Sequence, residues 1–97
     1  MHVISRRPLR EFAKRHPDAE SSLQAWFHEA RQAHWSTTTD IKRQYGSASI
    51  LKGSRVVFNL CGNKYRLVVR INYRAEVVFV RFIGTHADYD QINAETI

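Results

Sequence analysis

Apolar residues recur at helical spacing near the start of the chain, where Leu9 and Phe12 share one face of a predicted helix. Ser5 is placed to cap this helix. Pro8 lies in its first turn, where a missing N–H group costs little. The helix should end at His16-Pro17, because the residue before a proline avoids helical backbone.

A second amphipathic segment follows, and Asp18 is placed to cap it. One face of this predicted helix is apolar and consists of Leu23, Trp26, Phe27 and Ala30. Residues 36–40 break the pattern and offer caps for a short helical turn over residues 41–45, which Gly46 can stop. Residues 46–54 are rich in serine and glycine and predict a loop.

The rest of the chain has the pattern of strands. Residues 55–60 are rich in valine and are followed by Gly62-Asn63, a turn signal that predicts a hairpin. Residues 64–72 alternate between apolar and polar positions, which is typical of a half-buried strand. Residues 77–83 are apolar on both faces except for one arginine, which predicts a central strand.

Helices that precede an antiparallel meander predict a single α+β domain over residues 1–97, with the N-terminal helices packed on a small antiparallel sheet. Residues 1–4 could add a first edge strand but are too few to judge. The helices would cover one face of the second strand of the meander, formed by Tyr65, Leu67, Val69 and Ile71. The opposite face would then expose a basic stripe of Lys64, Arg66 and Arg70.

Charge narrows the range of partners. The net charge is +6 and the isoelectric point about 10.0, which favours nucleic acid, an acidic protein or an anionic membrane surface. The single cysteine, Cys61, excludes an internal disulfide and fits a reducing cytoplasm. No apolar run approaches the roughly 20 residues that span a bilayer, and no apolar stretch follows the N-terminal arginines, so we expect neither a membrane span nor a secretory signal.

The predicted basic stripe fits a nucleic-acid strand. Cations at alternate strand positions project the same way about 6–7 Å apart, the scale of the spacing between phosphates. A solvated sheet face is the alternative explanation. An aromatic neighbour such as Tyr45 or Tyr73 would offer a base a surface on which to stack.

Arg81 interrupts an otherwise apolar strand. A buried guanidinium without a partner is costly, so Arg81 must reach a carboxylate, a ligand or water. A structural ion pair with Asp88, Asp90 or Glu76 is one interpretation. Binding to a phosphate is the other.

The segment from Gly84 onward predicts a loop or one short turn that carries three chemically active side chains. His86, Tyr89 and Asp90 stand at positions i, i+3 and i+4, so they share one face of a helical turn. Asp90 could orient the His86 ring, which can then act as a general base or acid. A surface turn with a capped histidine is the competing explanation.

Other kinds of site have little support. The five histidines are scattered and the chain has no cysteine pair, so a zinc site is not expected. Gly-rich phosphate loops and a Gly-x-Ser-x-Gly motif are absent. Cys61 is predicted to be a packed residue.

Three segments together resemble the HigB-type toxins of bacterial type II toxin–antitoxin systems. They are Val56-Val57-Phe58-Asn59-Leu60, Gly62-Asn63-Lys64-Tyr65-Arg66-Leu67-Val68 and Gly84-Thr85-His86-Ala87-Asp88-Tyr89-Asp90. The resemblance covers nearly the whole chain, including residues 40–46. Its most specific motifs are Gly-Asn-Lys-Tyr-Arg-Leu and Thr-His-x-x-Tyr-Asp in combination.

The resemblance implies a RelE-like fold and cleavage of mRNA without a metal or other cofactor, usually on the translating ribosome. It also implies a cytoplasmic protein that an antitoxin with a helix-turn-helix domain neutralises. Related toxins use arginines on neighbouring strands and a histidine or tyrosine near the C-terminus, and Arg66, Arg81, His86 and Tyr89 match those positions best.

From these residues we expect proton transfer by His86, oriented by Asp90 and assisted by Tyr89, with Arg66 and Arg81 stabilising negative charge on the phosphate. Flanking phosphates of the RNA would be bound by Lys42, Lys64 and Arg70. Asn63 would contact a base or, as the favoured alternative, shape the turn. The alternative function is a non-enzymatic RNA- or ribosome-binding module with the same basic face. A third is action on a different target, as in gyrase-directed relatives of this fold.

Overall fold

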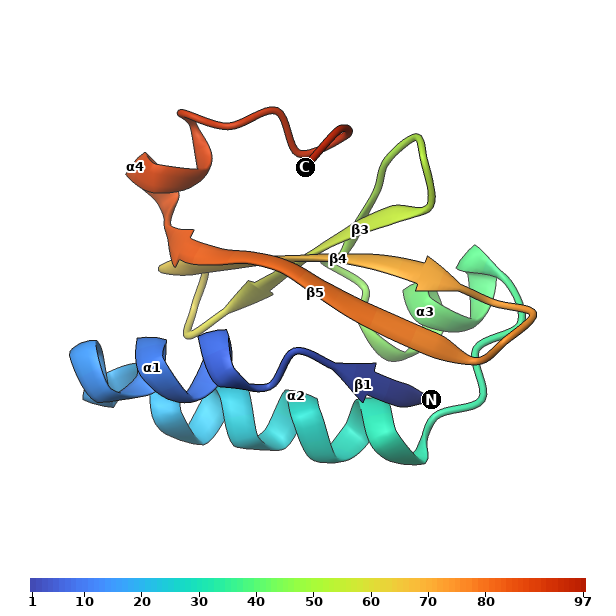
Figure 1. Ribbon diagram of the computed structural model, residues 1–97, viewed down its shortest axis with the longest axis horizontal. Coiled ribbons are helices and arrows are strands. Elements are labelled where there is room, and N and C mark those ends of the chain that lie inside the picture. The colour runs from blue at the N-terminus through green and yellow to red at the C-terminus, as the bar shows by residue number, and fades with distance from the viewer.

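The computed structural model describes residues 1–97 (Figure 1). Its elements are β1 (His2–Ile4), α1 (Arg7–Arg15), the 3₁₀ turn η1 (Pro17–Ala19), α2 (Glu20–Gln32), α3 (Thr38–Gln44), β2 (Ser49–Ile50), β3 (Arg55–Leu60), β4 (Tyr65–Asn72), β5 (Val77–Thr85) and α4 (His86–Tyr89). No helix combines the length and the apolar character that crossing a membrane requires.

The strands form one sheet in the order β1-β5-β4-β3-β2. Strands β3 to β5 are an antiparallel meander, as predicted, and β5 is an inner strand. Residues 46–54 are not entirely the predicted loop, because β2 within them pairs antiparallel with β3 and adds an edge strand. The N-terminal residues do add an edge strand, but β1 runs parallel to β5, with His2 opposite Val77. The predicted α+β class is confirmed, with helices packed on a small sheet that is antiparallel except for the pairing of β1 with β5.

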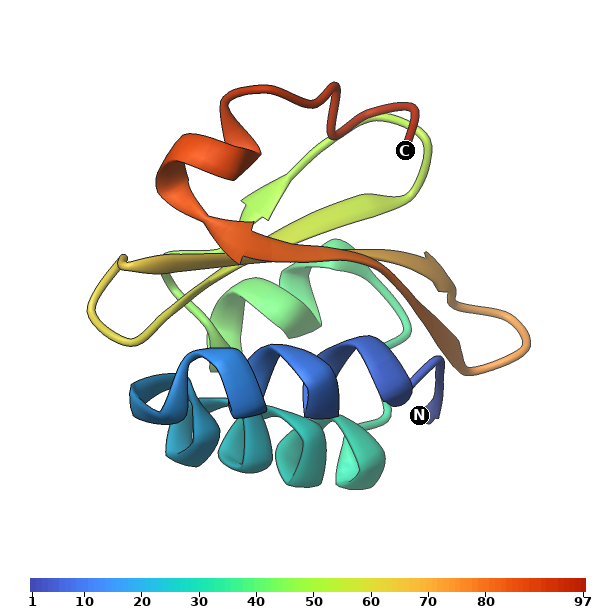
Figure 2. The same ribbon diagram turned by 60° about the vertical axis from the view of Figure 1, so that its left-hand side comes forward.

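All the longer helices lie on one face of this sheet (Figure 2). The main core joins Phe12, Leu23 and Trp26 from the helices to buried residues of the sheet. The predicted contact face of β4 is confirmed, because all four of its residues are at most 2% exposed: Tyr65, Leu67, Val69 and Ile71. Trp35, which no helical pattern marks, is also buried in this core.

Two predicted helix caps are wrong. Ser5 has a φ of 75°, and α1 begins after Arg6, with no side-chain hydrogen bond at its cap. Asp18 lies in η1, where its carboxylate turns toward the sheet, and α2 also begins without a side-chain cap. The short helix α3 does have the predicted cap, a reciprocal pair of hydrogen bonds between Thr37 and Asp40.

The C-terminal segment covers part of the other face of the sheet. It crosses above the strands after α4 in Figure 2. A second, smaller apolar cluster lies beneath it, centred on Val57, Val68 and Ala94 and joined by Leu51, Phe82, Tyr89, Ile92 and Ile97. This cluster supports α4 from below. The face opposite the helices is thus only partly exposed to solvent. The alternating pattern of β4 predicts an exposed face and does not indicate that the C-terminal segment covers part of it.

Candidate active site

The turn α4 is fixed to the end of β5 by two reciprocal hydrogen bonds, each from a backbone amide to a side-chain oxygen. Thr85 Oγ1 accepts a hydrogen bond from the Asp88 amide at 3.2 Å, and Asp88 Oδ2 accepts one from the Thr85 amide at 3.3 Å. A glycine at position 84 permits this close return of the chain. A Cβ atom there would lie 2.6 Å from the Phe82 ring and 3.0 Å from the Asp88 Cβ.

The predicted contact between His86 and Asp90 is confirmed. His86 Nδ1 donates to Asp90 Oδ2 at 3.1 Å, across one turn of helix. This hydrogen bond fixes the ring, and His86 Nε2 makes no hydrogen bond within the protein. In the neutral ring Nε2 is therefore a free acceptor. The side chain of His86 is 59% exposed, so a substrate can reach it.

Tyr89 lies on the inner side of α4. Its side chain is half-buried against the small cluster around Val68, and its hydroxyl makes no hydrogen bond within the protein. Packing of this ring holds α4 against the sheet. The free hydroxyl is consistent with the predicted role as a donor to a ligand.

Arg66 comes from β4 at the same end of the sheet. It stands opposite Gly84 in the ladder between β4 and β5, and α4 packs against both strands. Its guanidinium donates to the Asn63 carbonyl at 2.6 Å. The side chain is half-buried, so its position is restrained. The structure thus brings Arg66 and α4 to one place on the face opposite the long helices.

Arg81 occupies a β-bulge. Two neighbouring pairs, Val68 with Phe82 and Val69 with Val80, leave one extra residue on β5 between them. That residue is Arg81, and its side chain is exposed. Bulges next to active sites re-aim a side chain out of the regular alternation of the strand. The cost of burying a guanidinium does not arise here.

The alternative explanation of Arg81 as a structural ion pair is wrong, because Arg81 makes no ion pair. Each of the three acidic residues considered has another partner. Asp90 binds His86, Asp88 closes the cap of α4, and Glu76 binds His34 at 3.2 Å. The Arg81 guanidinium is therefore free to bind an anion.

The predicted basic stripe is shorter than expected. Lys64 lies before the start of β4, in the turn, and its ammonium pairs with Asp18 instead of standing beside Arg66. This ammonium, followed by the Tyr65 hydroxyl, holds the pKa of Asp18 below its usual value, and Asp18 raises the pKa of Lys64 in return. Arg66 and Arg70 remain on the face opposite the helices.

Asn63 and Lys42 have structural roles as well. Asn63 has a φ of 70°, and with Cys61 and Gly62 it forms a run of left-handed residues that turns the hairpin. Lys42 Nζ donates to the carbonyls of Gly46 and Ala48 at 2.6 and 2.8 Å.

Neither tyrosine considered as a stacking surface lies on this face. Tyr45 and Tyr73 both pack against the main core, on the helical side. The Tyr45 hydroxyl donates to Glu29 at 2.9 Å, and burial, followed by this carboxylate, raises the pKa of Tyr45. The suggestion that these rings stack on bases beside the basic stripe is wrong.

One cation of the exposed face was missed. Arg55 stands opposite Arg70 in the ladder between β3 and β4. Its guanidinium donates to the Ile97 carbonyl at 2.6 and 3.1 Å and so holds the C-terminal segment down. Only the register between strands reveals this position. The structure contains no group of three or more His, Cys, Asp or Glu side chains that could share a metal ion.

Comparisons with known proteins identify a family of similar sequences. A family model described as "HigB_toxin, RelE-like toxic component of a toxin-antitoxin system" matches residues 19–92. The chain is 27% identical over 94 residues to the "mRNA interferase HigB" of Escherichia coli O6:H1, covering 95% of the chain and 91% of that relative. It is 25% identical over 96 residues to the "mRNA interferase toxin HigB" of Escherichia coli K12, covering 97% and 92%.

Proposed function

The chain belongs to the HigB family of RelE-like toxins, and we propose that it is an endoribonuclease that cleaves mRNA as the toxin of a toxin–antitoxin pair. The names of its curated relatives, mRNA interferases, support this activity. The observation that carries the proposal is the His86–Asp90 pair beside Arg66, on a face with free cations. When the 2′-hydroxyl of RNA attacks the neighbouring phosphate, the reaction requires a group that transfers protons and cations that stabilise negative charge.

The proposed reaction uses the ribose as nucleophile. The 2′-oxygen attacks the adjacent phosphorus, its proton passes to a base, and the P–O5′ bond breaks as the leaving 5′-oxygen takes up a proton. The products are a 2′,3′-cyclic phosphate and a 5′-hydroxyl end. His86 Nε2 is the proposed proton-transfer atom, since Asp90 holds Nδ1. Tyr89 is the proposed hydrogen-bond donor to the phosphate or the leaving oxygen.

Two arginines are proposed to stabilise the charge that develops on the phosphorane. Arg66 is half-buried and restrained by the Asn63 carbonyl, which is the preorganisation that electrostatic catalysis needs. Arg81 is exposed on its bulge without an ion pair and can reach a phosphate. Lys42, Asn63, Lys64 and Arg70 are proposed to contact the flanking RNA, with Lys42 and Lys64 sharing their ammonium groups with internal partners.

The proposed setting is the cytoplasm, with mRNA bound on the ribosome as substrate. The antitoxin of the pair is proposed to carry a helix-turn-helix domain. Both details go beyond the family description, which names only the toxic component of a toxin–antitoxin system.

The test is incubation of the purified protein with end-labelled mRNA, with and without translating ribosomes. We expect cuts within the coding region that carry 2′,3′-cyclic phosphate ends, with more cutting when ribosomes are present. The double variant Arg66→Ala/His86→Ala is the matched inactive control. If the protein binds RNA or ribosomes without producing new ends, the non-enzymatic binding module is the correct function.

A further inference from the structure

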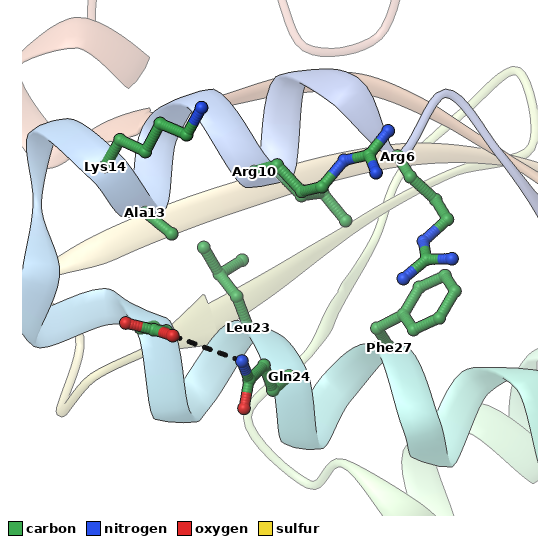
Figure 3. A pocket seen from close by; sticks show the side chains of 9 residues that line it. Arg6, Arg10, Ala13, Lys14, Leu23, Gln24 and Phe27 are labelled. Atoms are coloured by element: carbon green, nitrogen blue, oxygen red, sulfur yellow. Dashed lines mark hydrogen bonds between the residues drawn. The ribbon is translucent and has the colours of Figure 1, made fainter.

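A groove runs between α1 and α2, away from α4. It has a volume of about 360 Å³, and its apolar floor comes from Leu9, Ala13, Leu23 and Phe27 (Figure 3). Leu9 and Leu23 are buried as part of the main core, whereas Ala13 and Phe27 are only partly covered. The groove lies in the helical layer, on the side of the sheet opposite α4 (Figure 2).

Cations without ion pairs line this groove. Arg6, Arg10 and Lys14 all border it, and none of them is paired with a carboxylate. The Arg6 guanidinium lies over the Phe27 ring, 4.0 Å from its centroid (Figure 3). Glu20 is the single acidic residue in the lining, and its carboxylate accepts a hydrogen bond from Gln24.

The cationic lining continues toward the N-terminus. A second hollow of about 250 Å³ shares Arg6 and Phe27 with the groove and reaches Arg31 on α2. Arg31 also lies near the Phe27 ring, 5.7 Å from its centroid, and makes no ion pair. The apolar floor of the groove and the cations without ion pairs thus form one continuous surface along α1 and α2.

We propose that this groove docks an acidic, amphipathic segment of the antitoxin. The inference rests on the proposed toxin function, because that function supplies the partner. Apolar side chains of the segment fill the space above Ala13 and Leu23, and carboxylates on its edges pair with Arg6, Arg10 and Lys14. Removal of apolar surface from water supplies the affinity, and the complementary charge sets the register.

An acidic protein segment fits this groove better than RNA does. The floor is aliphatic except for Phe27, and that ring is already covered by the Arg6 guanidinium, so a base has no free ring on which to stack. A partner bound here lies on the helical side of the sheet. It can therefore hold the toxin without touching His86.

The test compares neighbouring charge reversals on α1. Lys14→Glu changes the lining of the groove, whereas Arg15→Glu makes the same change of net charge at an exposed residue that does not line it. Each variant is titrated calorimetrically against the protein encoded in the adjoining reading frame. We expect Lys14→Glu to weaken the complex by about ten-fold or more and Arg15→Glu to change it little.

A second variant tests the apolar floor without changing charge. Ala13→Phe places a ring in the groove and should also weaken the complex, with thermal melts confirming that the variant is folded. Equal weakening by Lys14→Glu and Arg15→Glu overturns the proposal, as does the absence of any complex with the unaltered chain. If Lys14→Glu lowers RNA binding instead, the groove belongs to RNA. The titration needs no cleavage, so it is independent of the endoribonuclease assay.

Discussion

At the residue scale, His86 should separate chemistry from folding. The side chain is exposed and its one side-chain hydrogen bond is to Asp90, so His86→Ala should leave the thermal transition cooperative and near its original temperature. Loss of a general acid–base group slows a reaction by about 10²–10⁴-fold, and mRNA cleavage should fall by that amount. Single-turnover cleavage assays beside circular dichroism melts measure both. His28→Ala, at an exposed histidine of α2, is the control. Full cleavage by a folded His86→Ala protein would remove His86 from the reaction.

Arg81 gives a second test at a single residue. Because its side chain is exposed and unpaired, Arg81→Ala should change the free energy of unfolding by no more than about 0.5 kcal/mol. If it stabilises the phosphorane, cleavage should fall by about 10²–10³-fold. Arg74→Ala, at an exposed arginine in the turn before β5, should leave cleavage unchanged. Unfolding of Arg81→Ala would restore the structural explanation of this residue.

Contacts between residues a few positions apart could be predicted from the sequence, whereas contacts between residues far apart along the chain could not. The His86–Asp90 contact follows from i, i+4 spacing within one helical turn, so the sequence alone was enough. Lys64 and Asp18 are 46 residues apart and meet only because η1 packs against the hairpin. The apolar pattern of β5 predicted a buried position for Arg81 and therefore a high cost. A bulge in fact frees Arg81 from the alternation of the strand, and a bulge has no clear pattern in the sequence of a single strand.

At the element scale, the return of α4 over β5 depends on Gly84. An alanine there would place its Cβ 2.6 Å from the Phe82 ring and 3.0 Å from the Asp88 Cβ, closer than packed atoms approach. Relief of such overpacking costs about 1–3 kcal/mol, and it would shift α4 relative to Arg66. We expect Gly84→Ala to lower both the melting temperature and cleavage. Gly46→Ala is the matched control, because nothing lies within 4 Å of the added Cβ. Equal behaviour of the two variants would contradict the prediction.

The tie between η1 and the β3–β4 hairpin should appear as a pH dependence of stability. The pKa of Asp18 is lowered by Lys64 and then by Tyr65, so its contribution is present above the unfolded pKa and lost as pH falls through the folded one. The pKa of Lys64 is raised by Asp18, so its contribution is present below the usual value of 10.5 and lost as pH rises through the folded pKa. The pair therefore stabilises the fold at neutral pH.

Asp18→Asn should accordingly melt at a lower temperature than the unaltered protein at pH 7. The difference should shrink as the pH falls through the usual carboxyl pKa of 3.8 and below, because the native carboxylate is then protonated as well. Melting temperatures from pH 7 to pH 2.5 measure this convergence. Glu95→Gln, at an exposed acid, should differ little from the unaltered protein at any pH. A difference for Asp18→Asn that stays constant with pH would show that the ion pair does not contribute.

Elements with strong patterns were predicted and short ones were not. The bounds of β3 match its valine-rich run, and the buried face of β4 matches its alternation. β2 has two residues, too few to show alternation, so the segment 46–54 was predicted as a loop. The parallel pairing of β1 with β5 joins the two ends of the chain, and no local pattern contains that information.

At the scale of the whole molecule, the net charge is divided between two surfaces. Arg66 and Arg70 lie on the sheet side, which is the face opposite the long helices, whereas Arg10 and Lys14 line the groove in the helical layer. The sequence gives the total of +6 and favours anionic partners, but the division requires the fold. It allows one small protein to bind RNA on one side and an acidic protein on the other.

RNA bound on the sheet side should respond strongly to salt. Each phosphate neutralised contributes a slope of about −0.7 to the logarithm of affinity against the logarithm of salt concentration for a single strand. Arg70 is exposed and unpaired on the sheet side, so Arg70→Ala should reduce the slope by less than one unit and weaken binding without regard to sequence. Lys64→Ala should reduce it less, because Asp18 already neutralises that ammonium. Arg15→Ala, at an exposed residue of α1 in the helical layer, should leave the slope unchanged. Fluorescence anisotropy with a short single-stranded RNA measures the slopes of these variants. The salt concentration runs from about 50 mM to about 300 mM, which spans physiological ionic strength. A flat salt response would rule out electrostatic binding on the sheet side. An effect of Arg15→Ala equal to that of Arg70→Ala would place the RNA elsewhere.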